Sequence, residues 1–172
     1  GTLIPSFKKA KAQLDTLVTS GGVSAVHYGN KLGFRFASTD LKKIWKNSKI
    51  NTVVIATRHD THSNLVKLAL ESRKNIFVEK PLALKLEELD LINSTFRHIV
   101  NHKKKSLRLM VGFNRRFAPH IVKMKSLLEI KQEPKSIVMT VNAGAIAPDH
   151  WTQDTEIGGG RIIGEACHFI DL

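Results

Sequence analysis

Cysteine is almost absent from this sequence: Cys167 is the only one among 172 residues. A single cysteine excludes an internal disulfide framework and any zinc site that needs several cysteines. No apolar run approaches the roughly 20 residues of a membrane span, and the first residues lack the charged and apolar regions of a signal peptide. We therefore expect a cytoplasmic protein with no metal site and no membrane partner.

Aromatic residues are also scarce, at 6% of the chain, and they do not interleave with the basic residues. That arrangement disfavours a platform on which nucleic-acid bases stack. Much of the net charge of +12 comes from lysines scattered over predicted helix faces, and the densest basic cluster spans residues 102–105. We expect a solvated surface and no nucleic-acid partner, in a field that favours anionic substrates or cofactors.

The first two-thirds of the chain alternate apolar, β-branched runs with segments of helical periodicity. These patterns predict strands over residues 14–19, 52–57, 76–78 and 107–113, and helices over 24–32, 41–45, 63–70 and 86–100. Asp40 fits the N-cap position of the helix over 41–45. Apolar strands at this rhythm, joined by helices, imply right-handed βαβ units. The sequence thus predicts an α/β fold with a doubly wound parallel sheet of buried strands.

The pattern changes after Phe113. It predicts a helix over residues 118–129, a strand over 136–141, a Gly- and Pro-rich loop over 142–160 and a closing helix. A second domain, of α+β class, is therefore expected to begin at Asn114. This places the first domain at residues 1–113 and the second at 114–172.

Polar residues follow directly after predicted strands in three places, at residues 57–62, 79–81 and 112–117. Pro81 has no N–H to donate to a sheet ladder, so the strand that leads to Glu79 has to end there. The carboxyl ends of parallel strands are where open α/β sheets bind ligands. Lys80 at such an edge can be partly desolvated and tuned toward proton transfer. Taken alone, residues 79–81 also fit a plain ion pair before a turn.

A glycine-rich turn at residues 158–160 leads into the closing helix. That helix carries Glu165, His168 and Asp171 at successive three-residue offsets. In an α-helix these offsets place the three side chains roughly along one face. The sequence therefore predicts a polar, titratable face at this helix.

Glu-Lys-Pro at 79–81, Gly-Phe-Asn-Arg-Arg-Phe at 112–117 and Gly-Gly-Gly…His-x-x-Asp at 158–171, in this order, resemble the glucose–fructose oxidoreductase / inositol dehydrogenase family, Gfo/Idh/MocA. The resemblance covers nearly the whole chain. It implies a Rossmann NAD(P)-binding domain followed by an α+β substrate and dimerisation domain. It further implies an NAD(P)-dependent dehydrogenase that acts on the CH–OH group of a sugar, cyclitol or related polyol, and a homo-oligomer at full length.

The first strand and the Gly-rich phosphate loop of such a domain are not found in the sequence. The first residues read instead as the beginning of the helix that follows that loop. We therefore expect an internal fragment that binds dinucleotide poorly and is inactive on its own.

The resemblance assigns the catalytic lysine to Lys80, which would donate or share a proton with the substrate oxygen. It assigns the catalytic histidine to His168, as proton shuttle or general base, and it implies a cis bond between Lys80 and Pro81. The family's aspartate four residues before the histidine is replaced by Gly164, and Glu165 follows it. We expect Glu165 to orient the His168 imidazole from a shifted angle. The competing interpretation is a non-catalytic Rossmann-like binding or regulatory protein.

NAD-specific enzymes usually carry a carboxylate after the second strand, and Thr-Ser-Gly-Gly at 19–22 offers none. NADP is therefore favoured over NAD, with Ser20 as a neighbour of the 2′-phosphate. The other candidate cofactor contacts lie at the predicted strand ends: Thr57, Arg58, His62, Glu79, Lys80 and Pro81. For His59 and His62, surface decoration is an equal alternative.

Four residues are candidates for contact with the substrate: Asn114, Arg116, Trp151 and Asp171. Asn114 and Arg116 lie at the predicted domain junction, where the alternative is a structural salt-bridge hinge. Trp151 offers an aromatic face on which a sugar can stack, and the alternative for it is core packing.

Overall fold

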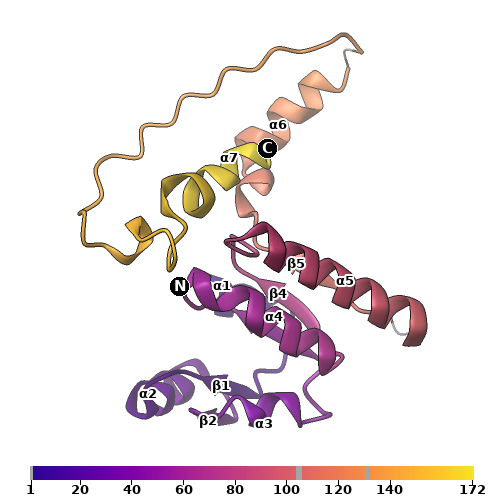
Figure 1. Cartoon of the computed structure of the whole chain (residues 1–172), viewed down its shortest axis with the longest axis vertical. Coiled ribbons are helices and arrows are strands. Elements are labelled where there is room, and N and C mark those ends of the chain that lie inside the picture. The colour runs from indigo at the N-terminus through magenta and orange to yellow at the C-terminus, as the bar shows by residue number, and fades with distance from the viewer. Residues whose placement is uncertain (1, 104–105, 131) are drawn as a thin grey trace. The chain divides into compact units, whose positions relative to one another are not determined.

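The computed structural model describes residues 2–103, 106–130 and 132–172. They form two compact units, one that ends at Asn51 and one that begins at Thr52. Helices and parallel strands alternate as far as residue 111, and only helical elements follow (Figure 1). The predicted α/β fold with parallel strands is therefore confirmed.

The first unit contains two short parallel strands and three helices: α1 (Leu3–Lys9), β1 (Thr16–Val18), α2 (Gly22–Leu32), β2 (Phe36–Ser38) and α3 (Lys42–Trp45). Thr16 lies opposite Phe36 in the ladder. Asp40 Oδ1 accepts a hydrogen bond of 2.8 Å from the Lys42 backbone N–H. The N-cap residue of α3 is Leu41, however, because the helix begins one residue later than predicted. Strand β2 was not predicted, because its sequence, Phe-Ala-Ser, contains no β-branched residue that favours a strand.

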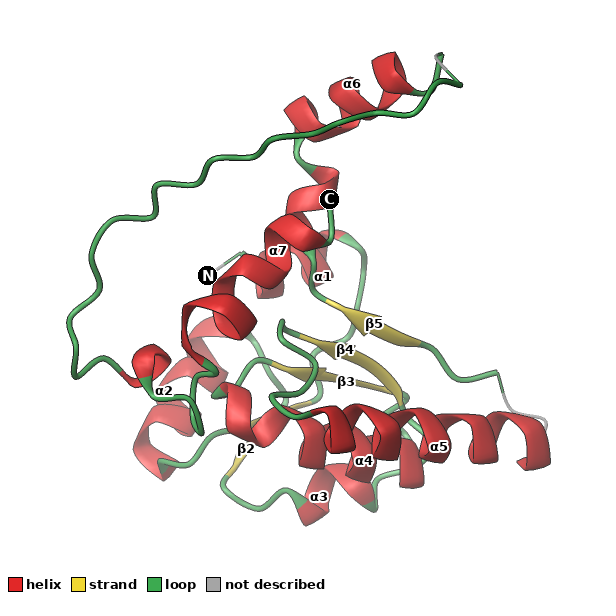
Figure 2. Cartoon of the chain, turned by 45° about the horizontal axis from the view of Figure 1, so that its top comes forward, coloured by secondary structure: helices red, strands yellow, loops and turns green. Residues whose placement is uncertain are grey.

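The second unit is built on a three-stranded parallel sheet in the order β3 (Thr52–Ile55), β4 (Asn75–Val78), β5 (Leu109–Val111). Helices α4 (His62–Glu71) and α5 (Leu86–Lys103) connect these strands and lie beside the sheet (Figure 2). Ile55 pairs with Val78, and Val78 pairs with Val111. The three strands therefore end level with one another, and the residues after them share one edge.

The core of this unit lies between one face of the sheet and its helices. Val66, Leu70 and Val78 have no exposed surface, and burying each such side chain contributes about 1.5–3 kcal/mol. Burial alternates along the strands, and Val54 and Met110 are 42% and 49% exposed. Residues 52–57 were predicted as a buried apolar run, whereas only alternate residues of β3 are buried.

Helix α6 (Pro119–Leu128) follows the sheet, as predicted. The predicted strand over 136–141 is not formed, and Ile137 and Val138 are 66% and 91% exposed. A strand is stabilised by a partner ladder, and none of the described residues pairs with this segment. The predicted domain boundary at 113/114 falls inside the second unit and stays a prediction.

The predicted closing helix consists of two pieces, a π-helical turn over Ile162–Ala166 and the short helix α7 (Cys167–Ile170). A 3₁₀ turn over Trp151–Gln153 precedes them. Within the described residues, no helix combines the length and the apolar character that a membrane crossing requires. Lys104 and Lys105, in the predicted basic cluster, lie outside the described residues.

Candidate active site

The site begins at the end of β4, where the chain leaves the sheet. The Glu79 backbone N–H donates to Ile55 O at 2.9 Å, which extends the ladder with β3 by one residue. Pro81 then ends the ladder, as its missing N–H dictates. The Lys80–Pro81 peptide bond is cis, as the family resemblance implies.

Lys80 is held by two acceptors from the far end of the chain. Its Nζ donates to Glu165 Oε1 at 3.0 Å and to the Gly164 carbonyl oxygen at 2.5 Å. The Lys80 side chain is 14% exposed, whereas Glu165 is 40% exposed. An ammonium group has three N–H donors. Two of them are used here, which leaves one N–H donor for a further acceptor.

The π-helical turn brings Gly164 so close to the glycine-rich loop that a side chain does not fit. A Cβ built on Gly164 would lie 2.7 Å from the Gly158 carbonyl oxygen, well inside van der Waals contact. An aspartate at this position would force the loop or the turn to move. A glycine at this position therefore has a steric basis, and the carboxylate that reaches Lys80 comes from Glu165.

His168 is only 6% exposed, and its Nδ1 has no hydrogen-bond partner among the described residues. Its ring packs edge-to-face against Phe113, with centroids 6.1 Å apart. Burial lowers the pKa of His168 below its ordinary value of 6.5, and the positive charges of Lys80 and Arg115 lower it further. The imidazole is therefore neutral at pH 7 and able to accept a proton.

The expected contact between Glu165 and the His168 imidazole is not formed, because the Glu165 carboxylate binds Lys80. A π-helical turn changes the angular spacing of its residues relative to an α-helix. The three side chains predicted on one face consequently have different surroundings: Glu165 pairs with Lys80, Asp171 pairs with Arg116, and His168 lines a pocket.

His59 and His62 are both buried, which is contrary to surface decoration. His59 Nδ1 lies 2.8 Å from Gly158 O, and its ring meets Trp151 edge-on with centroids 4.9 Å apart. His62 lies between two carbonyl oxygens, with Nδ1 2.7 Å from Pro81 O and Nε2 3.1 Å from Thr57 O. Both His62 nitrogens face backbone carbonyl oxygens, which places the ring between β3 and the cis Lys80–Pro81 bond.

The first two-thirds of this chain match a described protein family. Residues 3–113 match the model of an oxidoreductase family with an NAD-binding Rossmann fold, Gfo/Idh/MocA. The chain belongs to this family.

Individual Gfo/Idh/MocA proteins are similar over most of this chain. Myo-inositol 2-dehydrogenase of Thermotoga maritima is 30% identical over 142 residues, which cover 83% of this chain and 40% of that protein. Levoglucosan dehydrogenase of Pseudarthrobacter phenanthrenivorans is 28% identical over 155 residues, which cover 86% of this chain and 38% of that protein. The chain therefore spans less than half the length of these relatives.

A solved structure of levoglucosan dehydrogenase, in complex with NADH and levoglucosan, superposes on 93% of this chain and 44% of its own. The TM-score is 0.77 at 25% sequence identity. The predicted Rossmann-like architecture and the Gfo/Idh/MocA resemblance are thereby confirmed.

The remaining candidates for cofactor contact in this Gfo/Idh/MocA chain lie at the strand ends. Thr57 is exposed and its Oγ1 is 2.6 Å from Thr61 Oγ1. Arg58 lies over the Trp151 ring, 5.8 Å from its centroid. Glu79 packs against Gly112, where a Cβ would lie 3.1 Å from Glu79 Oε2. Ser20 belongs to the first unit and is exposed after β1.

Among the substrate candidates, Arg116 and Asp171 bind each other. Arg116 Nε donates to Asp171 Oδ2 at 2.8 Å, and Nη2 donates to Oδ1. The hydrogen bond from Arg116 lowers the pKa of the Asp171 carboxyl below its ordinary value. This pair fits the salt-bridge hinge alternative. Trp151 is half-buried against His59, which is a packing role.

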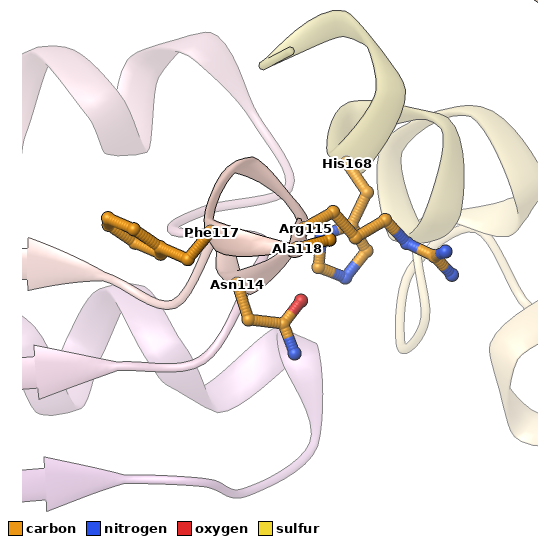
Figure 3. A pocket seen from close by; sticks show the side chains of 5 residues that line it. All are labelled: Asn114, Arg115, Phe117, Ala118 and His168. Carbon is orange, nitrogen blue, oxygen red and sulfur yellow. The ribbon is translucent and has the colours of Figure 1, made fainter. Parts of the chain in front are cut away.

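Asn114 lines an open pocket of about 400 Å³ together with Arg115, Phe117, Ala118 and His168 (Figure 3). Sequence reasoning missed Arg115, because nothing in a pair of adjacent arginines indicates which one is ion-paired. It also gave no role to the Gly164 carbonyl oxygen, because every residue has a backbone carbonyl and residue type does not indicate which one accepts a hydrogen bond.

Proposed function

We propose that this chain is part of an NAD(P)-dependent oxidoreductase that transfers a hydride between a nicotinamide cofactor and the CH–OH group of a sugar, cyclitol or related polyol. One observation carries the proposal. Lys80, paired with Glu165, and the buried, partner-free His168 Nδ1 lie at the carboxyl edge of a parallel sheet. The names of the relatives, which include inositol and levoglucosan dehydrogenases, support this class of substrate.

The residues at this edge fit a nicotinamide cofactor. The aligned ends of β3, β4 and β5 bring Thr57, Glu79 and Asn114 to one side of the sheet, which is where open α/β sheets bind dinucleotides. Thr57, Arg58 and Glu79 are the side chains proposed to hold it, beside Lys80 and Pro81. The nicotinamide, when bound, supplies the hydride chemistry.

The protein's own contribution is the handling of one proton. The free N–H of Lys80 donates to the reacting oxygen and stabilises negative charge that develops on it. When the substrate is oxidised, the hydroxyl proton leaves that oxygen, and His168 accepts it on a ring nitrogen because the imidazole is neutral. In the reverse direction the same nitrogen returns the proton. Hydrogen bonds to Glu165 and to the Gly164 carbonyl hold the Lys80 ammonium in one orientation.

NADP is proposed as the preferred dinucleotide, with NAD as the alternative that the family description names. The support is local: residues 19–22, which follow β1, contain no carboxylate, and Ser20 is exposed there. A ribose-binding carboxylate repels a 2′-phosphate, so its absence removes a barrier to NADP. Steady-state KM values for NADPH and NADH on the full-length protein test this choice.

A non-catalytic, Rossmann-like regulatory protein is the second candidate, and Gly164 in place of the family's aspartate favours it. The two functions are distinguished with the full-length protein, reduced cofactor and a panel of keto-sugars. Oxidation of the nicotinamide, followed by its absorbance, supports the enzyme. Tight cofactor binding with no absorbance change on addition of any keto-sugar supports the regulatory protein.

Further proposals concern the full-length protein. We propose that it acts in the cytoplasm as a homo-oligomer on a small-molecule substrate, without a nucleic-acid or membrane partner. The scarce aromatic residues support the absence of nucleic-acid binding. The domain division at 113/114 also stays a proposal, and the family match that ends at residue 113 supports it.

A further inference from the structure

The two neighbouring arginines that follow β5 differ in their partners. Arg116 forms two hydrogen bonds to Asp171. No carboxylate among the described residues pairs with Arg115, whose guanidinium carbon lies 4.6 Å from the centre of the Phe169 ring. Aromatic contact orients a guanidinium without neutralising its charge. The positive charge of Arg115 is therefore not compensated by a carboxylate, whereas Asp171 compensates that of Arg116.

Arg115 lines the pocket that also contains His168 (Figure 3). His168 is 6% exposed, and its unpartnered Nδ1 is a buried polar atom. Buried polar atoms are nearly always hydrogen-bonded in folded proteins. Among the described residues, no carboxylate pairs with Arg115 and no group bonds His168 Nδ1, and of the two the pocket-lining Arg115 guanidinium is the group that a ligand in the pocket can reach.

The acidic groups near the pocket are already engaged. Glu165 is bound to Lys80, and Asp171 is bound to Arg116. The local field that remains is positive, and the chain as a whole carries a net charge of +12. A guanidinium presents a planar fork of N–H donors that matches a carboxylate or a phosphate in two parallel hydrogen bonds. The chemistry of the pocket is thus that of an anion site.

We propose that the substrate of this protein carries an anionic group, a carboxylate or a phosphate, and that Arg115 binds it. This inference rests on the proposed function, since it specifies the sugar or polyol that the same site receives. Arg116, held by Asp171, fixes the turn from which Arg115 projects.

The test uses full-length protein with NADH bound and isothermal titration with three probes: D-glucose, D-glucuronate and D-glucose 6-phosphate. At least one of the anionic probes is expected to bind about 10- to 100-fold more tightly than glucose. This is the gain in affinity that a hydrogen bond to a charged group provides. Which anion binds more tightly distinguishes a sugar acid from a sugar phosphate. Equal affinities, or no detectable binding of either anion, overturn the proposal.

Arg115→Gln is expected to abolish the preference for the anions, and Arg115→Lys to keep part of it through the charge alone. Arg97→Gln, which removes an exposed arginine of α5, controls for net charge and should change nothing. Thermal melts verify that each variant is folded. If Arg115→Gln weakens NADH and leaves the sugars unaffected, Arg115 serves a cofactor phosphate and the proposal is wrong.

These outcomes are separable from the proposed function. Arg115-dependent anion binding without hydride transfer to any keto-sugar contradicts the enzyme and leaves the anion site standing. Hydride transfer to neutral keto-sugars, together with equal affinities for glucose, glucuronate and glucose 6-phosphate, supports the enzyme and contradicts the anion site.

Discussion

Lys80 Nζ lies 3.0 Å from Glu165 Oε1, although 85 residues separate them in sequence. The contact joins the end of β4 to the π-helical turn over Ile162–Ala166. The Gly164 carbonyl oxygen, from the same turn, accepts a second hydrogen bond from Lys80. The ammonium therefore has a fixed direction, and the carboxylate compensates part of its charge in a site where Lys80 is only 14% exposed.

Glu165→Gln is expected to lower kcat by about 10- to 100-fold, less than the 10²–10⁴ that an acid–base group itself supplies. Glutamine keeps the shape of the side chain but removes its negative charge, so the Lys80 ammonium is held less firmly in its orientation. Substrate binding should be retained. KM should change little. Steady-state rates of the full-length protein measure both constants.

The matched control is Glu156→Gln, because Glu156 also pairs with a lysine, Lys85, at 2.7 Å on an exposed surface. It should leave kcat unchanged. If Glu165→Gln turns over within about twofold of the parent, Glu165 has no part in the mechanism.

Gly164→Ala is expected to destabilise the protein by about 1–3 kcal/mol, the usual cost of overpacking. The added Cβ would lie 2.7 Å from Gly158 O, a backbone atom that cannot rotate away. The displaced Gly164 carbonyl should also reduce kcat. Gly22→Ala is the control, since a Cβ there meets only ordinary contact, 3.7 Å from Thr39 Cγ2. Denaturant unfolding with equal stability for both variants would contradict the close packing.

His59→Leu is expected to lower stability by about 1–3 kcal/mol, because it leaves the buried Gly158 carbonyl without its donor. His59→Asn keeps an N–H close to the position of Nδ1 and should restore most of the loss. Urea unfolding compares the two variants. Equal losses in both would show that the hydrogen bond to Gly158 is not what His59 contributes.

Stability should depend on pH through His59 and His168, whose pKa values are both lowered from 6.5, in each case chiefly by burial. Below pH 6.5 the unfolded chain binds protons that the folded chain does not, so stability falls as pH drops. The loss continues until the lowered folded-state pKa values are reached. Asp171 acts in a separate window, below its ordinary value of 3.8.

Melting temperatures between about pH 8 and pH 5 measure this dependence. We expect them to decrease toward acid, with a shallower slope in His59→Leu than in the parent. An identical slope in both proteins would mean that His59 does not titrate differently in the folded and unfolded states.

The sheet and the two central catalytic candidates were predictable from sequence for definite reasons. β3 and β4 are apolar runs between helices of clear periodicity, and parallel pairing follows from that order. Lys80 and His168 lie in motifs whose order along the chain matches a family. Pro81 marks the end of β4 by its chemistry alone.

Other features depend on partners that no local pattern reveals. The segment over 136–141 alternates like a strand, but a strand forms only with a ladder partner. The contacts of His59 with Gly158 and of Lys80 with Gly164 join residues 99 and 84 positions apart. The π-helical turn was missed because three-residue offsets were interpreted with α-helical geometry.

Single-turnover hydride transfer in the full-length protein is the most direct test of the role proposed for Lys80. Lys80→Ala, loaded with reduced cofactor and mixed with a keto-sugar that the parent reduces, should oxidise the nicotinamide about 10²–10⁴ times more slowly. Its affinity for the cofactor, measured by nicotinamide fluorescence, should stay within a few-fold of the parent. A variant that transfers hydride at the parental rate would contradict the assignment of Lys80 as the hydrogen-bond donor that stabilises the reacting oxygen.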